Sequence, residues 1–248
     1  MEDHTLTIFK LLPKTSLSSY PMSQEEHCQV SGTVIQQPVT MKKNIYLSIM
    51  GTMGSGKTTV AQLLARELKF RVLEENFGEN TFLPRFYQDM NRWAFQSQTF
   101  YLMEKITQLL ATPKLLLKHS VIQDTPIQQD AFSYAKAQHV LGHMDDAEWK
   151  LYQKIYKSFE PYFPKPDLIV FLETSVTELV RRIASRGYEY EQAIPKSYVE
   201  LLDMLNHKWL TENKTIPVLT VETDGLNVVR SKTAQGALLA KIKTTLKW

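Results

Sequence analysis

The sequence predicts a three-layer α/β fold in which helices flank a five-stranded parallel sheet. Apolar runs of strand length alternate along the chain with longer segments whose apolar residues recur at helical spacing. A glycine-rich segment, 51–58, stands between the first strand and the first helix. Enough residues separate successive strands for helical crossovers, which parallel neighbours require. Together these features indicate one α/β domain.

The strands are expected where apolar runs end in polar or charged residues. The clearest is 167–173, whose five consecutive apolar residues are typical of a strand buried on both faces. The first, 44–50, leads directly into the glycine-rich segment. The others are expected at 70–74, 119–124 and 217–222.

Helices are expected between and after these strands. Residues 57–69 place Val60, Leu63, Leu64 and Leu68 at helical spacing. The aromatic-rich segment that follows the second strand is interpreted as two helices broken around Met90-Asn91, the second continuing through Leu110. Further helices are expected near Asp130, over 145–161, from Thr174 or Ser175 to Gly187, from Pro195 through Trp209, and from Thr233 to Leu246.

Residues 1–42 are expected to form a flexible extension, and residues 43–248 to form the domain. The extension is rich in Ser, Thr, Gln, Glu and Pro and shows no lasting helical or strand period. Its acidic residues, Glu2, Asp3, Glu25 and Glu26, are unusual in an organellar transit peptide, so organellar targeting has weak support. The single cysteine, Cys28, suits a reducing compartment, and the cytoplasm is expected.

The composition narrows the classes of partner. A net charge of +3 over 248 residues is small, and the basic residues are scattered, which argues against nucleic acid. No apolar stretch approaches the length of a membrane span, so no membrane partner is expected. A small anion is the expected ligand.

Gly51–Thr58 matches the phosphate-loop pattern GxxxxGK[ST], and its position between a strand and a helix predicts a P-loop NTPase fold. Such a loop directs backbone N–H groups at phosphates, while Lys57 faces the β- and γ-phosphates and the Thr58 hydroxyl ligates Mg²⁺. A turn that binds nothing is the alternative, and it leaves the Lys57-Thr58 pair unexplained. The predicted ATP-binding residues are Gly51, Thr52, Met53, Gly54, Ser55, Gly56, Lys57, Thr58 and Thr59.

Acidic residues end two strands on the rim that carries this loop. Asp124 ends 119–124 and is expected to hold Mg²⁺ directly or through water. Glu74 and Glu75 follow the second strand, either as a catalytic base or as a solvated acidic turn. Asp130 lies near a helix start, where a favourable interaction with the helix dipole is the simpler explanation.

Two further features have both a functional and a structural interpretation. Gln98 is embedded among aromatic residues, where its amide either reads the edge of a base or ties down a loop. Arg181, Arg182 and Arg186 precede Gly187, which suits a mobile lid over transferred phosphate or a solvated basic face.

With these motifs in order, residues 44–224 resemble the deoxyribonucleoside kinase family, which includes deoxyguanosine, deoxyadenosine and deoxycytidine kinases. The resemblance implies that Glu75, which precedes Phe86-Tyr87 by eleven residues, is the base at the sugar 5′-hydroxyl. It implies catalytic roles for Lys57 and for the lid arginines Arg182 and Arg186. The residues that match the nucleoside site are Tyr87, Trp93, Gln98, Lys105, Asp130, Tyr134 and Glu191.

Three positions depart from the family pattern. Asn76 replaces a proline, Thr125 stands where the family has arginine, and Tyr188 replaces a lid arginine. Guanidinium clamps contribute roughly 10³-fold or more to phosphoryl transfer. A slower enzyme, a shifted substrate and a degenerate kinase therefore all remain open.

The resemblance implies ATP-dependent phosphorylation of a deoxynucleoside with Mg²⁺, and a homodimer. Two alternatives stay open: a nucleoside monophosphate kinase, and an inactive relative that acts as a binding or assembly subunit. The preferred base is also open, because the side chains of Gln98 and Asp130 can pair with more than one base.

Overall fold

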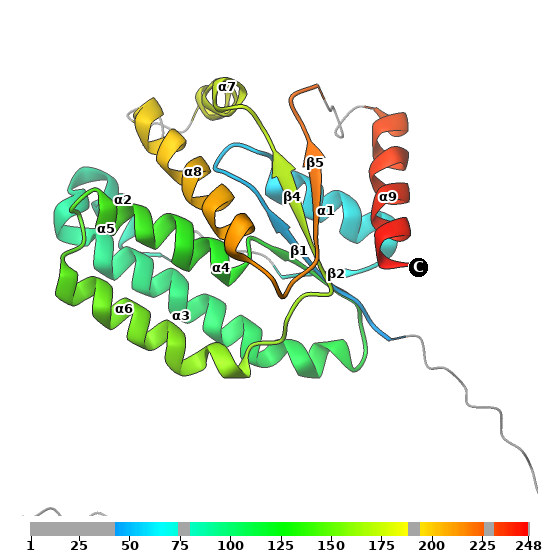
Figure 1. Cartoon of the computed structure of the whole chain (residues 1–248), viewed down its shortest axis with the longest axis horizontal. Coiled ribbons are helices and arrows are strands. Elements are labelled where there is room, and N and C mark those ends of the chain that lie inside the picture. The colour runs from blue at the N-terminus through cyan, green and yellow to red at the C-terminus, as the bar shows by residue number, and fades with distance from the viewer. Residues whose placement is uncertain (1–42, 74–79, 188–193, 226–230, 248) are drawn as a thin grey trace, which may run out of the picture. The chain divides into compact units, whose positions relative to one another are not determined.

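Five parallel strands form one sheet in the order β2-β3-β1-β4-β5, which confirms the predicted architecture (Figure 1). The computed structural model describes residues 43–73, 80–187, 194–225 and 231–247. The strands are β1 Tyr46–Met50, β2 Arg71–Leu73, β3 Val121–Asp124, β4 Leu168–Glu173 and β5 Val218–Glu222. Each is slightly shorter than the sequence predicted. The extension predicted for residues 1–42 lies outside the described residues.

The helices follow the predicted order. They are α1 Lys57–Leu68, α2 Leu83–Gln88, α3 Met90–Leu116, α4 Ile127–Gln129, α5 Lys136–Val140, α6 Asp146–Phe159, α7 Val176–Arg186, α8 Lys196–Glu212 and α9 Lys232–Leu246. A π-helical stretch, η2 Asp130–Ala135, joins α4 to α5, and a 3₁₀ turn, η3 Glu160–Tyr162, ends α6. The π-helical stretch was not predicted, and such stretches are often found at functional sites.

Several helix boundaries differ from the sequence prediction or decide between its alternatives. The break between α2 and α3 falls at Asp89, whose side chain caps α3 by accepting a hydrogen bond from Arg92 N at 3.0 Å. The helix α3 then continues past Leu110 to Leu116. At α7, Ser175 provides the cap by accepting a hydrogen bond from Glu178 N.

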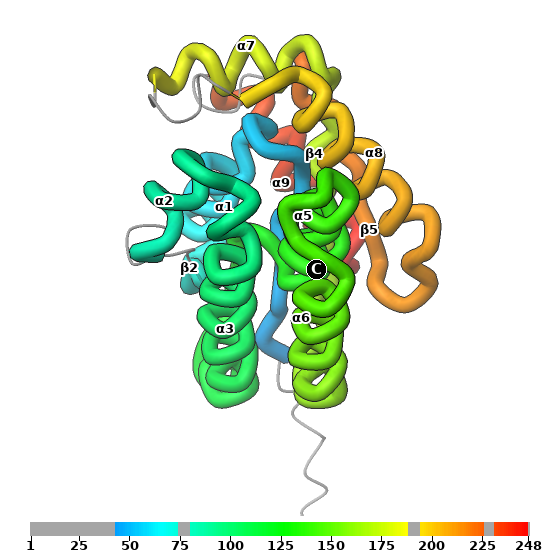
Figure 2. The backbone as a smooth tube through the Cα atoms, turned by 90° about the vertical axis from the view of Figure 1, so that its left-hand side faces the viewer, coloured from blue at the N-terminus to red at the C-terminus, as the bar shows by residue number. Residues whose placement is uncertain are grey.

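Apolar side chains on both faces of the sheet fix the three layers. On one face, α1 and α9 pack against β1 and β4 through residues such as Leu64, Ile242 and Val170. On the other, α3 and α6 contribute Leu102, Ile106 and Tyr152 to a second core cluster. Figures 1 and 2 show this division, with α3 and α6 side by side and α7 across the end of the sheet where β4 finishes.

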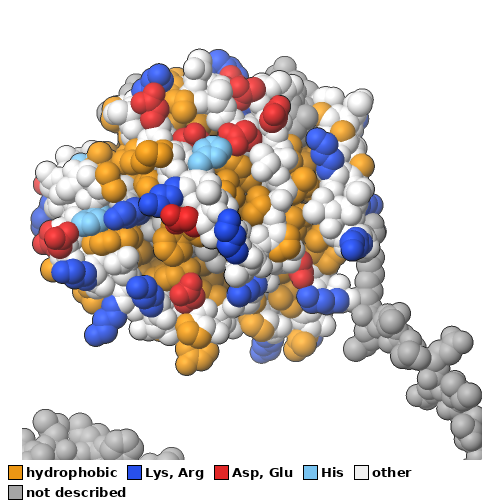
Figure 3. Space-filling view, in the orientation of Figure 1, with side chains coloured by type: hydrophobic (Ala, Val, Ile, Leu, Met, Phe, Trp, Pro, Cys, Tyr) orange, Lys and Arg blue, Asp and Glu red, His pale blue; other side chains and the backbone are white. Residues whose placement is uncertain are grey.

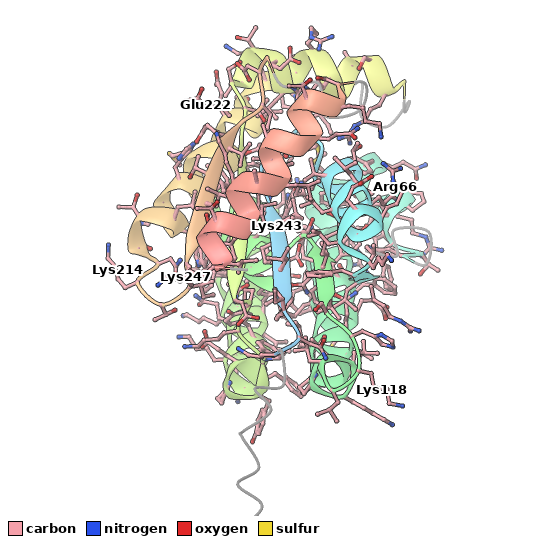
Figure 4. All side chains as sticks on the ribbon, turned by 90° about the vertical axis from the view of Figure 1, so that its right-hand side faces the viewer. Arg66, Lys118, Lys214, Glu222, Lys243 and Lys247 are labelled. Carbon is pink, nitrogen blue, oxygen red and sulfur yellow. The ribbon has the colours of Figure 1, made fainter. Side chains whose placement is uncertain are left out.

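The basic side chains on the side of the molecule that carries α9 belong to separate parts of the fold. Figure 4 shows Arg66 on α1, Lys118 beyond α3, Lys214 beyond α8 and Lys243 on α9 at different places on the molecule. Among the described residues, no helix combines the length and the apolar character that crossing a bilayer needs.

Candidate active site

The phosphate loop connects the end of β1 to the start of α1, and its glycines are required by close contacts. A Cβ on Gly51 would lie 2.5 Å from Ser55 Oγ and 3.0 Å from the Leu172 carbonyl oxygen. Gly54 and Gly56 adopt φ angles of 89° and 95°, which favour glycine. No side chain of the described residues caps α1, so the N–H groups of its first turn are oriented to bind an anion.

Neighbouring elements hold the backbone of this loop. The Lys57 ammonium donates to Gly51 O at 2.9 Å. The amide of Gln129 pairs with both backbone groups of Gly51, accepting from its N–H at 3.2 Å and donating to its carbonyl at 2.6 Å. Both Gln129 and Gly51 are buried. The loop is therefore tied to the segment that follows β3.

The second loop residue, Thr52, is tied to α8. Its hydroxyl donates to Asp203 Oδ1 at 2.9 Å and accepts from Asn206 Nδ2 at 3.0 Å. The same carboxylate lies 3.7 Å from His207 Nε2. These contacts place the helix α8 against the start of the phosphate loop.

Of the two predicted lid arginines, Arg182 contacts the loop. Its guanidinium donates to Ser55 O at 3.2 Å and to Thr223 O at 2.7 Å. Glu178 accepts from Arg182 and also pairs with Arg181, and these hydrogen bonds lower the pKa of Glu178 to about 2. Arg186 is exposed in the last turn of α7.

Asp124 ends β3 beside the loop, as predicted. It is buried, and the strand register pairs it with Ile49 of β1. The next residue, Thr125, has a φ of 64°, a strained conformation for a β-branched residue. The buried ammonium of Lys105 donates to Asp124 O at 2.9 Å and to Thr125 O at 2.7 Å. Lys105, which the sequence predicts for the nucleoside site, therefore stabilises the turn at Thr125.

Asp130 lies at the start of η2, close to Lys105. Its Oδ2 is 4.0 Å from the Lys105 ammonium, and both side chains are almost fully buried. Burial and, to a smaller extent, the charge of Asp130 raise the pKa of the Tyr152 hydroxyl. A buried carboxylate beside a lysine is a polar group that can orient a ligand.

The other described residues that the sequence predicts for the nucleoside site lie on α2, α3 and η2. Gln98 is buried, and its amide forms no hydrogen bond within the described part of the chain, so it does not tie down a loop there. Burial raises the pKa of Tyr198, and the nearby Tyr87 raises it further. Tyr134 packs in a cluster with Met53 of the phosphate loop. The cluster places Tyr134, which the sequence predicts for the nucleoside site, next to the phosphate loop.

Trp93 is packed at the corner between α2 and α3. Its ring stacks on Phe82 at a centroid distance of 5.9 Å. The guanidinium of Arg92 lies 4.6 Å from the ring centroid, and that of Arg85 lies 5.1 Å from it. These neighbours give Trp93 a packing role in this corner.

Several predicted positions lie outside the described residues. They are Glu75, Glu191 and the substituted positions Asn76 and Tyr188. Their roles remain predictions.

Sequence reasoning missed the residues that hold the loop from outside it: Gln129, Asp203 and Asn206. Sequence spacing carries no signal for these contacts, because they join positions that are 78, 151 and 154 residues apart.

Comparison with known proteins identifies the family. A family model described as deoxynucleoside kinase matches residues 47–247. The deoxyadenosine/deoxycytidine kinase of Bacillus subtilis is 27% identical over 208 residues, covering 82% of this chain and 94% of that protein. The deoxyguanosine kinase of the same organism is 28% identical over 202 residues, covering 80% and 96%.

A solved structure supports the fold. Deoxyadenosine kinase from M. mycoides aligns with a TM-score of 0.72 and 24% identity, over 81% of this chain and all of that one (100%). With the phosphate loop and the family match in agreement, the chain belongs to the deoxynucleoside kinase family and is a phosphotransferase.

Proposed function

We propose that the protein transfers the γ-phosphoryl group of ATP to the 5′-hydroxyl of a deoxynucleoside. The observation that carries this proposal is a complete phosphate loop tied through Gln129 to the segment that begins with the buried Asp130. The buried Gln98 lies on α3, which packs against that segment. Relatives that act on different deoxynucleosides share the family, so the acceptor class is supported while the base is not.

In this mechanism the chain aligns the reactants and neutralises charge, because phosphoryl transfer needs little covalent assistance. Backbone N–H groups of the loop and Lys57 hold the donor phosphates. Arg182 and Arg186 approach the transferred phosphoryl group, and Arg182 already contacts the loop at Ser55 O. Glu75 accepts the proton of the 5′-hydroxyl.

The residues present fit Mg²⁺. This ion takes one or two protein oxygens and completes its shell with phosphates and water. Thr58 is exposed at the start of α1, and Asp124 stands at the end of the neighbouring strand β3. These two side chains would hold the ion, which when bound neutralises charge on the β- and γ-phosphates.

The acceptor side is proposed to read both sugar and base. Tyr87 and Glu191 bind the 3′-hydroxyl, Gln98 and Asp130 hydrogen-bond the base, and Tyr134 stacks on it. Lys105 contributes a charge beside Asp130 while it holds the turn at Thr125. Trp93 supports this wall from the corner of α2 and α3.

Two other functions are distinguishable. A nucleoside monophosphate kinase needs extra cations for the acceptor phosphate, and Thr125 and Tyr188 are changes in the opposite direction. An inactive binding subunit has no need for Lys57, Thr58, Glu75 and Asp124 together.

The test is phosphoryl transfer from ATP with Mg²⁺ to the four deoxynucleosides, their ribonucleoside counterparts and their monophosphates. Turnover on one or more deoxynucleosides, with little on the rest, is the expected result and identifies the base. Turnover on monophosphates alone would overturn the proposed acceptor. ATP binding without turnover on any acceptor would favour the inactive subunit.

We also propose a homodimer that forms through the face of η2, α5 and α8. Four exposed apolar side chains lie there: Phe132, Val140, Leu141 and Met204. Phe132 also lines a hollow of about 630 Å³, whose other aromatic residues include Trp149 and Trp209. Figure 3 shows hydrophobic side chains with interspersed lysines over this region. Such an apolar face is typical of a protein interface.

Sedimentation of full-length protein tests the dimer. The Met204→Glu change places a charge in the proposed interface and should yield monomers. Leu117→Glu is the control, because Leu117 is 80% exposed beyond the end of α3. A monomeric wild-type protein, or a Met204→Glu dimer of unchanged affinity, would contradict this proposal.

A further inference from the structure

Gln129 occupies a position where a strand hydrogen bond is missing. In a parallel ladder, Thr125 N–H donates to Ile49 O, which it does at 3.1 Å. If the two strands continued to pair, Gly51 N–H would donate to Thr125 O. The N–H of a residue further along the second strand would then donate to Gly51 O. Here Thr125 turns away with a φ of 64°, and its carbonyl accepts from Lys105 instead.

The Gln129 amide takes over both missing contacts. Its oxygen accepts from Gly51 N–H at 3.2 Å and its nitrogen donates to Gly51 O at 2.6 Å. A primary amide offers the acceptor and the donor that a neighbouring strand would offer. With Gln129 only 1% exposed, bulk water cannot readily replace it.

Gly51 O has a second donor, and that donor has another task. The Lys57 ammonium contacts the same carbonyl at 2.9 Å. When Lys57 turns to the β- and γ-phosphates of ATP, this buried carbonyl keeps the Gln129 hydrogen bond. A buried carbonyl without any donor would oppose that turn.

We propose that Gln129 is a positioning residue that keeps the phosphate loop in shape while Lys57 moves from Gly51 O to the nucleotide. Gln129 directly precedes Asp130, so the segment that holds the donor loop continues into the helix that faces the acceptor. This inference rests on the proposed binding of ATP at the loop, and it concerns affinity for ATP independently of the acceptor.

The test is the Kd of Mg·ATP for full-length protein without any nucleoside. Gln129→Met keeps the length of the side chain and removes both hydrogen bonds, so the Kd should rise about ten-fold. Gln138→Met is the matched control: it removes an equally buried amide from α5, one that donates to Tyr198 Oη at 2.9 Å and not to the loop. Its Kd for ATP should equal that of the wild type.

Lys57→Met separates positioning from general destabilisation. If Gln129 acts by satisfying Gly51 O when Lys57 leaves, the Gln129→Met change should alter ATP affinity much less in the Lys57→Met background. Thermal unfolding confirms that each variant is folded. Should Gln129→Met not fold, Gln129→Glu replaces the donor with a carboxylate and should also weaken ATP binding.

Unchanged ATP affinity in a folded Gln129 variant would overturn the proposal, as would an equal loss in the presence and absence of Lys57. Wild-type protein that binds no ATP would overturn the proposed function as well. Wild-type protein that binds ATP but phosphorylates no acceptor would overturn only the proposed function, and the Gln129 comparison would still be decided.

Discussion

The backbone of the phosphate loop and the side chain of Gln98, which is proposed to bind the base on the acceptor side, differ in how their polar groups are satisfied. In the phosphate loop, Gly51 is held by Gln129 and Lys57, and Thr52 is held by two residues of α8. On the proposed acceptor side, the amide of Gln98 forms no hydrogen bond within the described residues.

This difference separates a preorganised phosphate site from a site whose hydrogen bonds await the base. The donor loop is held in its shape by the protein itself, so a phosphate chain meets N–H groups already in place. Gln98 is 7% exposed, so its amide can exchange a contact with water for a direct hydrogen bond to a ligand. The acceptor side is therefore expected to gain more order and more hydrogen bonds from its ligand than the donor side.

The largest effect is expected from a change that removes the proposed base and leaves the binding surfaces for ATP and nucleoside intact. Glu75→Gln should lower kcat by roughly 10²–10⁴-fold, because the 5′-hydroxyl loses its base. Nucleoside affinity should remain close to that of the wild type, as measured by direct titration. Glu74→Gln is the neighbouring control, and turnover unchanged in Glu75→Gln would reject Glu75 as the base.

Gln98→Leu should affect the acceptor side alone. Losing the amide should reduce kcat/KM for the preferred deoxynucleoside by roughly 10–100-fold, since the base loses its hydrogen bonds. The Kd for ATP should stay unchanged. Gln96→Leu is the control on the same helix, because the Gln96 amide, with its oxygen and nitrogen exchanged, pairs with Arg92. Equal losses for nucleoside and ATP would remove the contrast between the two sides.

Thr125 provides a smaller effect, on stability. Within a strand, a variant with glycine is usually less stable than the same protein with alanine. At Thr125 a φ of 64° reverses this order. The free energy of unfolding of the Thr125→Gly variant should therefore be about 1 kcal/mol higher than that of the Thr125→Ala variant. Urea unfolding measures it. At Thr220, exposed in β5, the alanine variant should be the more stable one.

The smallest effect concerns the helix that bears the lid arginines. Hydrogen bonds from Arg181 and Arg182 lower the pKa of Glu178 from 4.5 to about 2. A lowered pKa means that the stabilisation is complete above pH 4.5 and is lost as the pH falls toward 2. The difference in Tm between wild type and Glu178→Gln should shrink across that window. A constant difference would contradict these pairings.

Local patterns made much of the donor side predictable. A phosphate loop uses consecutive residues, so Gly51–Thr58 shows both its pattern and its place between strand and helix. The parallel sheet and Asp124 at its rim follow from apolar runs and their ends. The described residues proposed for the acceptor side come from α2, α3 and η2, and only the family resemblance groups them.

The remaining contacts could not be read from sequence spacing. Gln129 meets Gly51 across 78 positions, and Asn206 meets Thr52 across 154. Such pairs follow no helical or strand period. Lys105 was expected to face the nucleoside, yet it also holds the turn at Thr125, because a chain that leaves its ladder exposes carbonyls that need a donor.

The most direct measurement follows ADP and nucleoside 5′-monophosphate together in reactions of the wild type and Lys57→Met with Mg·ATP and deoxynucleosides. The account predicts equal amounts of both products from the wild type, and a rate lower by roughly 10³-fold in Lys57→Met. Arg66→Met, an exposed change on the same helix, should match the wild type. ADP formed without a 5′-monophosphate, or full transfer without Lys57, would contradict the account.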